Sequence, residues 1–258
     1  MSNEIKKVAL NALKQSGRML RKAYAEFNRQ DVMLKSHREV LTKADLMSQE
    51  IIIGEIKKYF PGHDLVSEER ANQESRSEYI WYLDPVDGTT NFSMHNPLWS
   101  VSLALARRGE LIFGLIYAPM LEEIYLAQAG LGATLNGKKI NVSAISQGKV
   151  LNTFCHGSRD ADIKKAINYW RTQSLNELDC RRLGSAAIEL AYVASGRVES
   201  FVSPGTRDWD VAAGVLMVRE AGGKVTDFKG RDWRLGGPNI AASNGKVHTQ
   251  ILKAINGK

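Results

Sequence analysis

The apolar residues at the start of the chain recur with the three- and four-residue spacing of a helix. Between Ile5 and Phe27 they fall on one face, which predicts a long amphipathic helix. A second helical stretch follows, where Thr42 and Asp45 have the spacing of a capping box, and it runs to a stop at 61–62. We therefore expect two helices before the first strand signals.

Strand signals occupy the middle of the chain and alternate with helices in the second half. Strands are predicted at 79–84, 100–106, 111–117, 123–128, 150–156, 179–183, 198–202, 224–227 and 239–242. Asn136-Gly137 is a hairpin-turn signal. Further helices are predicted at 160–170, 185–194, 209–221 and 247–255. Because both halves combine helices with strands, we expect a layered α/β (α+β) sandwich.

The polar stretch 143–149 is the candidate boundary between two subdomains. It separates an N-terminal α+β subdomain, residues 1–146, from a C-terminal α/β subdomain, residues 147–258. A chain of 258 residues is long enough for one large domain or two closely packed smaller ones.

The composition is that of a globular protein, with 43% hydrophobic and 24% charged residues. The N-terminus lacks the apolar stretch of a signal peptide, and no run has the length of a membrane span. A cytoplasmic location is expected, so Cys155 and Cys180 should be reduced thiols. The net charge of +7 comes from short basic pairs spread along the chain. This distribution favours steering of an anionic small molecule over nucleic-acid binding.

The segment from residue 80 to residue 92 is an apolar strand that ends abruptly in acidic residues. Asp84 and Asp87 lie three apart across a proline, so both carboxylates can converge on a hard cation, with the Val86 carbonyl as a further ligand. Gly88-Thr89-Thr90 would then leave backbone N–H groups free for a phosphate. An isolated Asp-x-x-Asp-Gly is also compatible with an ordinary aspartate-rich turn.

The complete string at 84–92, Asp-Pro-Val-Asp-Gly-Thr-Thr-Asn-Phe, resembles the signature of the inositol monophosphatase family. Other segments resemble family blocks in the expected order, at 67–69, 184–187, 209–214, 220–223 and 241–244. The resemblance spans Lys35 to Asn244. It implies a sugar-phosphatase fold with alternating layers of helix and sheet, Mg²⁺ dependence, lithium sensitivity and a homodimer.

The resemblance also implies a set of metal ligands. Glu68, Asp84 and the Val86 carbonyl would hold the first Mg²⁺, and Asp84, Asp87 and Asp210 would hold the second. Two adjacent cations can activate a water and stabilise the leaving oxygen of an in-line displacement. Glu39 departs from the family pattern, which leaves a third Mg²⁺ open.

The implied catalytic residues are Glu68, Thr89 and Asp45. Thr89 and Asp45 would orient the attacking water, and Glu68 would share in activating it. Without the family pattern, Asp45 is an acid favoured by the dipole at a helix N-terminus. Lys35 has two interpretations. It lies either in a loop that closes over the metals or in a solvated connector.

The substrate contacts are expected at two groups of residues. The phosphate would be bound by Gly88, Thr89 and Thr90, and the remainder of the substrate by Gly184, Ser185, Ala186, Ser203, Arg207 and Asp210. Ser203 stands where many inositol monophosphatases have a glutamate that binds a sugar hydroxyl, and its segment resembles relatives that accept several sugar phosphates. Arg207 suits a second phosphate, although a pair with Asp208 is the alternative. A small-residue helix start also explains 184–186.

These observations predict a Mg²⁺-dependent phosphomonoesterase for a small sugar or polyol phosphate, with inositol 1-phosphate the first substrate to consider. A fructose-1,6-bisphosphatase or broad sugar phosphatase is the alternative within the enzymes. A partner protein in transcription or ribosome biogenesis is the alternative of another class. The presence of all the acidic metal ligands argues against a protein that only binds partners.

Overall fold

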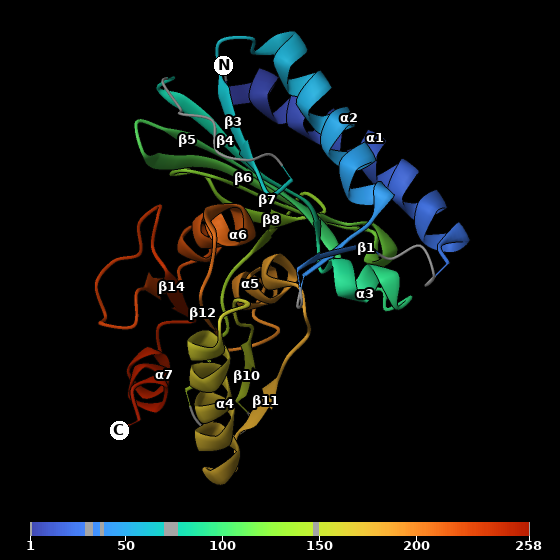
Figure 1. Cartoon of the computed structure of the whole chain (residues 1–258). Coiled ribbons are helices and arrows are strands. Elements are labelled where there is room, and N and C mark those ends of the chain that lie inside the picture. Colours follow the sequence, from blue (N-terminus) through green and yellow to red (C-terminus); the bar gives the residue numbers. More distant parts are fainter. Residues whose placement is uncertain (1, 29–32, 37–38, 70–76, 147–149, 258) are drawn as a thin grey trace.

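The structure of the chain is a computed structural model that describes residues 2–28, 33–36, 39–69, 77–146 and 150–257 (Figure 1). For residues 33–36 and 39–41 it describes the backbone only. Helices and sheets alternate in five layers, and each layer buries its apolar residues against the next.

The first layer consists of two helices that pack side by side, α1 (Ser2–Glu26) and α2 (Lys43–Tyr59). Both were predicted, and the capping box is confirmed. The Thr42 hydroxyl accepts from the Ala44 N–H at 3.2 Å, and the Asp45 carboxylate accepts from the Thr42 N–H at 2.9 Å. Along the chain, the two helices are separated by an unpredicted hairpin of β1 (Met33–Ser36) and β2 (Glu39–Leu41). These strands are too short to give a sequence pattern.

The second layer is a seven-stranded sheet in the order β3-β4-β5-β6-β7-β8-β9. Its strands are β3 (Asp64–Ser67), β4 (Tyr79–Asp87), β5 (Ser100–Arg107), β6 (Glu110–Ala118), β7 (Glu123–Gln128), β8 (Gly132–Leu135) and β9 (Lys138–Ile140). Only β3 and β4 are parallel. The strands predicted here are confirmed, as is the hairpin turn, where Asn136 and Gly137 both have positive φ. The short strands β3, β8 and β9 were not predicted, and of the last two only the connecting turn was.

The remaining three layers come from the second half of the chain. Helices α5 (Ala186–Ala194) and α6 (Asp208–Glu220) lie between the two sheets. The second sheet has the order β11-β10-β12-β14-β13, with β10 (Leu151–Phe154), β11 (Asp179–Arg181), β12 (Ser200–Pro204), β13 (Lys224–Thr226) and β14 (Asn239–Ser243). Helices α4 (Asp160–Leu175) and α7 (His248–Ile255) cover its outer face. The layered α/β sandwich predicted from the sequence is thus confirmed.

Two short helical segments complete the chain, α3 (Thr89–Ser93) and a 3₁₀ turn at Pro119–Leu121. The largest apolar core surrounds α5 and α6 and joins both sheets, with Tyr82 from one and Phe201 from the other. The subdomains that we propose, 1–146 and 147–258, each contain one of the two large sheets and share this core.

The end of β4 departs from regular strand geometry. Asp84 lies opposite Ser102 and Asp87 opposite Ser100, so three steps along β4 match two steps along β5. This bulge contains Pro85, which has no N–H to donate to the neighbouring strand. In a regular strand, residues three apart point to opposite faces. The extra residue therefore turns Asp84 and Asp87 to the same face, the one covered by α5 and α6.

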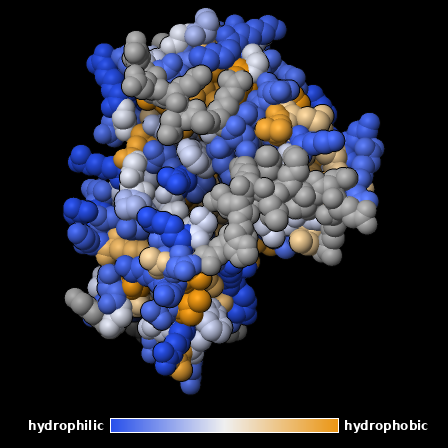
Figure 2. Space-filling model, in the orientation of Figure 1, coloured by the Kyte–Doolittle hydropathy of each residue, from blue (hydrophilic) through white to orange (hydrophobic). Residues whose placement is uncertain are grey.

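The surface seen in Figure 2 is dominated by polar residues, with apolar residues in small scattered groups. Within the described ranges, no helix combines the length and the apolar character needed to cross a membrane.

The close approach of β6 and α6 generates a test of this packing. A Cβ at Gly114 would lie 2.8 Å from the Ala213 carbonyl oxygen, so Gly114→Ala forces two backbones apart. We expect a loss of about 1 to 3 kcal/mol in the free energy of unfolding, measured by denaturant titration. The control Gly54→Ala meets no atom within 4 Å in α2 and should stabilise by up to about 1 kcal/mol. Equal stability of the two variants would contradict this packing.

Candidate active site

Two carboxylates lie at the end of β4, where the bulge turns them to one face. Asp84 and Asp87 are 3% and 7% exposed. The Asp84 carboxylate accepts from the Val86 N–H at 3.0 Å. This hydrogen bond joins the Asp84 side chain to the backbone of the bulge. The Ser48 hydroxyl of α2 donates to the Pro85 carbonyl at 2.8 Å. The bulge is therefore held from two sides.

The Asp87 carboxylate caps the N-terminus of α5, which begins almost one hundred residues later. It accepts from the Ala186 N–H at 3.2 Å, from the Ala187 N–H at 2.9 Å and from the Ser185 hydroxyl. The positive end of the helix dipole stabilises its charge. Ser185 and Ala186 were predicted as substrate contacts. In the structure, both donate hydrogen bonds to the Asp87 carboxylate.

Two further acids come from elements that flank β4. Glu68 follows β3, and its N–H donates to the Leu83 carbonyl at 3.2 Å, so it lies beside Asp84 on the neighbouring strand. Asp210 is in the first turn of α6, where its carboxylate accepts from the Arg207 N–H at 2.9 Å. The structure thus brings the four acids predicted as metal ligands together near the end of β4.

Asp45 and Thr89 are brought together as the sequence predicted. Asp45 is fully buried in the first turn of α2. The Thr89 hydroxyl lies 3.1 Å from an Asp45 carboxylate oxygen and 3.0 Å from the Val86 carbonyl, and it can donate its proton to either. Asp45 thus does more than cap a helix, because it also contacts the start of α3.

Burial and mutual repulsion raise the pKa of the four aspartates near this site. The pKa of Asp84 lies well above its usual range, because burial and then the charges of Glu68, Asp87 and Asp210 disfavour ionisation. Burial raises the pKa of Asp45 and of Asp87 to about 6, against the hydrogen bonds that each accepts. It raises the pKa of Asp210 to about 8, against the N–H and charge of Arg207. A bound cation would relieve this repulsion.

The chemistry of these donors fits Mg²⁺. The cation prefers oxygen ligands, and the predicted donors are carboxylates and the Val86 carbonyl, with no sulfur or imidazole group among them. Across the described residues, no group of three or more His, Cys, Asp or Glu side chains is arranged to hold a metal as it stands. The fit therefore rests on the type of donors and on the repulsion among the ionised carboxylates, which a cation would relieve.

The glycine after Asp87 joins this site to the start of α5. Gly88 has φ of 92°, and a Cβ there would lie 3.1 Å from the carbonyl oxygens of Leu98 and Gly184. Only glycine suits both the conformation and the space. Thr89 and the exposed Thr90 then begin α3, close to the turn at 184–186 that the sequence predicted as a substrate contact.

The other predicted substrate residues differ in exposure. Ser203 is 3% exposed on β12, whereas Arg207 is exposed immediately before α6. The Asp208 carboxylate accepts from the Gly236 N–H at 2.7 Å, and no ion pair joins it to Arg207 in the part of the chain that the structure describes. Lys35 is in β1 and Glu39 in β2, but their side chains lie outside the described part.

Two residues near the site were missed by the sequence interpretation. The Asn91 amide donates to the carbonyls of Leu98 at 2.6 Å and Leu183 at 2.8 Å, which joins α3 to the turn before α5. Glu189, in α5, is fully buried and accepts from the Gly184 N–H at 3.0 Å. Asn91 belongs to the signature string and could have been noted, but Glu189 looks like an ordinary helix residue.

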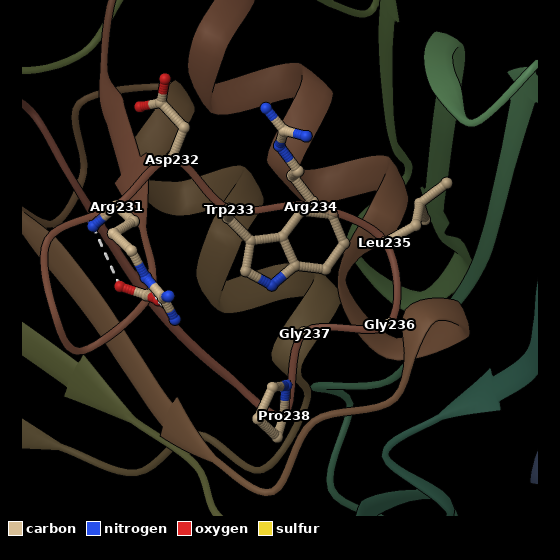
Figure 3. A pocket seen from close by; sticks show the side chains of 9 residues that line it. Arg231, Asp232, Trp233, Arg234, Leu235, Gly236, Gly237 and Pro238 are labelled. Atoms are coloured by element: carbon tan, nitrogen blue, oxygen red, sulfur yellow. Dashed lines mark hydrogen bonds and ion pairs between the residues drawn. The ribbon is translucent and has the colours of Figure 1, made fainter.

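A cavity of about 560 Å³ has none of the predicted site residues in its lining (Figure 3). Asp227 and residues 231–238 line it. Arg231 forms an ion pair with Asp227 at 2.6 Å, while Gly236 connects the lining loop to Asp208 at the start of α6. The acidic cluster, and not this cavity, is therefore the candidate active site.

The fold and the comparisons with known proteins define a class of phosphatases. The model of the inositol monophosphatase family matches residues 1–258, and the chain belongs to this family. The family is generally metal-dependent and acts on phosphate esters.

Several relatives resemble the chain over most of its length. An inositol-1-monophosphatase of Mesorhizobium japonicum is 35% identical, covering 96% of this chain and 94% of the relative. A fructose-1,6-bisphosphatase/inositol-1-monophosphatase of Thermotoga maritima is 36% identical over 85% and 83% of the two chains. The Nus factor SuhB of Escherichia coli K12 is 36% identical over 95% and 93%.

Solved structures agree with this assignment. The extragenic suppressor protein suhB of Bartonella henselae is similar to this chain with a TM-score of 0.91 and 33% identity. The match covers 98% of each chain. The layered fold described above is therefore that of the family.

The raised pKa of Asp210 generates a prediction for the metal-free protein. A carboxyl that binds its proton more tightly when folded makes the folded state less stable as pH rises from about 4 to about 8. The melting temperature of the metal-free protein should fall over this range, and it should fall less in Asp210→Asn. Calorimetric scans at pH 5 and pH 8 test this, with the exposed Asp179→Asn as the control. An Asp210→Asn profile parallel to wild type would contradict it.

Proposed function

We propose that the protein hydrolyses the phosphomonoester of a small polyol or sugar, with inositol 1-phosphate as the first candidate. The observation that carries this proposal is the convergence of Glu68, Asp84, Asp87 and Asp210 beside the start of α3. Acidic residues from the end of β3, the end of β4 and the first turn of α6 lie together despite their repulsion, which is expected for ligands of a divalent cation that binds phosphate.

Two or three Mg²⁺ ions are the proposed cofactors. The first would be held by Glu68, Asp84 and the Val86 carbonyl, and the second by Asp84, Asp87 and Asp210. When bound, they supply positive charge to the phosphate and acidify a water molecule. Glu39 leaves the third site as an open part of the proposal.

The residues of the chain would orient the attacking water. When the Thr89 hydroxyl donates its proton to Asp45, its lone pairs remain free to accept a hydrogen bond from the water. Glu68 would take part in accepting the water's proton. The backbone N–H groups and hydroxyls of Gly88, Thr89 and Thr90 would bind the phosphate.

Substrate selection is proposed at the start of α5 and α6. Gly184, Ser185 and Ala186 would lie against the sugar or polyol, with Asp210 and Arg207 on the opposite side. Ser203 provides no carboxylate for a sugar hydroxyl, which would relax discrimination among substrates. The relative from Thermotoga maritima, named for both fructose 1,6-bisphosphate and inositol phosphate, supports a broad sugar phosphatase as the alternative.

The metal-centred proposal is tested by Asp87→Asn. Phosphate release from myo-inositol 1-phosphate should require Mg²⁺ in the wild type and fall by about 100-fold or more in the variant, because one charged ligand is lost. The control Asp179→Asn, at an exposed site, should retain wild-type activity. Mg²⁺-independent turnover by the wild type, or a fully active Asp87→Asn, would overturn the proposal.

Arg207 is tested with two substrates. If it contacts a second phosphate, Arg207→Ala should lower kcat/KM for fructose 1,6-bisphosphate by about 10- to 100-fold, the value of a charged hydrogen bond. The value for inositol 1-phosphate, which has one phosphate, should stay within about threefold. Equal losses for both substrates would indicate that Arg207 acts through its neighbour Asp210 instead.

A second candidate function is supported by the relatives called Nus factor SuhB. In that case the chain would bind a protein partner in transcription or ribosome biogenesis, a role that Asp87→Asn would leave intact. We also propose a homodimer, a cytoplasmic location and sensitivity to lithium, as expected from the family. Nucleic acid is not a proposed partner, because the basic pairs are dispersed.

A further inference from the structure

The turn before α5 forms hydrogen bonds with side chains on both of its sides. The Asn91 amide of α3 donates to the Leu183 carbonyl at 2.8 Å. On the other side, one carboxylate oxygen of Glu189 accepts from the Leu183 N–H at 3.1 Å and from the Gly184 N–H at 3.0 Å. The turn is therefore fixed at three of its backbone groups by side chains.

The same turn determines the position of the groups that hold Asp87. Gly184 has φ of 85°, and directly after it come the Ser185 hydroxyl and the N–H groups of Ala186 and Ala187, all of which donate to Asp87. A rotation at Leu183–Gly184 would move all three donors together. Within one short segment, Glu189 thus binds the N–H groups of residues 183 and 184, and Asp87 binds those of residues 186 and 187.

The cost of burying Glu189 indicates that the carboxyl has a specific task. It is fully buried in α5, and burial raises its pKa to about 8. The Cys155 thiol donates to the same oxygen at 3.1 Å. An apolar residue of similar size would avoid the desolvation of a carboxyl, so helix packing alone does not explain a glutamate here.

We propose that Glu189 is a positioning residue for the metal site: by holding the Leu183–Gly184 turn, it sets the donors that orient the Asp87 carboxylate. The inference rests on the proposed function, in which Asp87 is a Mg²⁺ ligand. Glu189 touches neither the substrate nor Asp87, and it acts through the backbone. The expected effect of its loss is a weaker Mg²⁺ site with little change in the overall fold.

The matched pair Glu189→Met and Glu189→Gln tests this inference. The two side chains have nearly the same length, but only Gln keeps an acceptor for the two N–H groups. Met avoids the burial of an unpaired polar group at the side chain, so both variants should fold. Val193→Ala, a fully buried change at the other end of α5, controls for a general loss of packing.

Two measurements are made on each variant. Calorimetric titration with Mg²⁺ should give a dissociation constant raised by about 10-fold or more in Glu189→Met, because partners that orient a metal ligand typically contribute this much. Glu189→Gln and Val193→Ala should stay within about threefold of wild type. In the metal-free protein, hydrogen exchange at residues 183–187 should accelerate in Glu189→Met alone.

The outcomes separate this inference from the function on which it rests. If the wild type binds Mg²⁺ and Asp87→Asn does not, but Glu189→Met behaves like Glu189→Gln in both measurements, the positioning role is overturned and the function stands. If Asp87→Asn binds Mg²⁺ as tightly as wild type, the metal role of Asp87 fails. In that case hydrogen exchange still shows whether Glu189 holds the turn. A Glu189→Met variant that does not fold, beside a folded Val193→Ala, would overturn the claim that the fold tolerates its loss.

Discussion

The repulsion among carboxylates buried at the end of β4 is the constraint on which the rest of the site depends. Asp84 and Asp87 are nearly inaccessible to water, and Glu68 and Asp210 add their charge to the same region. Burying an isolated carboxylate costs free energy, so buried carboxylates are found with hydrogen bonds, helix ends or cations around them. The described structure supplies the first two.

The layered fold supplies these partners from distant parts of the chain. The N-termini of α2, α5 and α6 all meet the edge of the sheet where β4 ends, and the α5 N-terminus binds Asp87 directly. The bulge in β4 is what turns both aspartates toward α5 and α6. Since the site assembles only when both sheets enclose these helices, the shared core around α5 and α6 is also what holds the chemistry together.

The periodic elements could be predicted from the sequence because their own residues define them. Helices α1 and α2 show their amphipathic spacing, and the strands from β4 to β7 are long enough to show theirs. The missed strands β1, β2, β3, β8 and β9 have only three or four residues each, and they form because neighbouring strands satisfy their backbone groups. The acids of the site were predicted from the family pattern, whereas Glu189 and the shared role of Ser185 and Ala186 required the folded chain.

The sequence by itself determined the family, the layered class and the identity of the acids, because each of these is carried by short segments whose own residues form a recognisable pattern. Only the tertiary structure decided which groups orient those acids. Asp87 and Ala187 are one hundred residues apart, and the Leu183–Gly184 turn is held by side chains from both directions along the chain. Such contacts depend on the register of two sheets and on the angle of the helices between them, and no local pattern of residues records either.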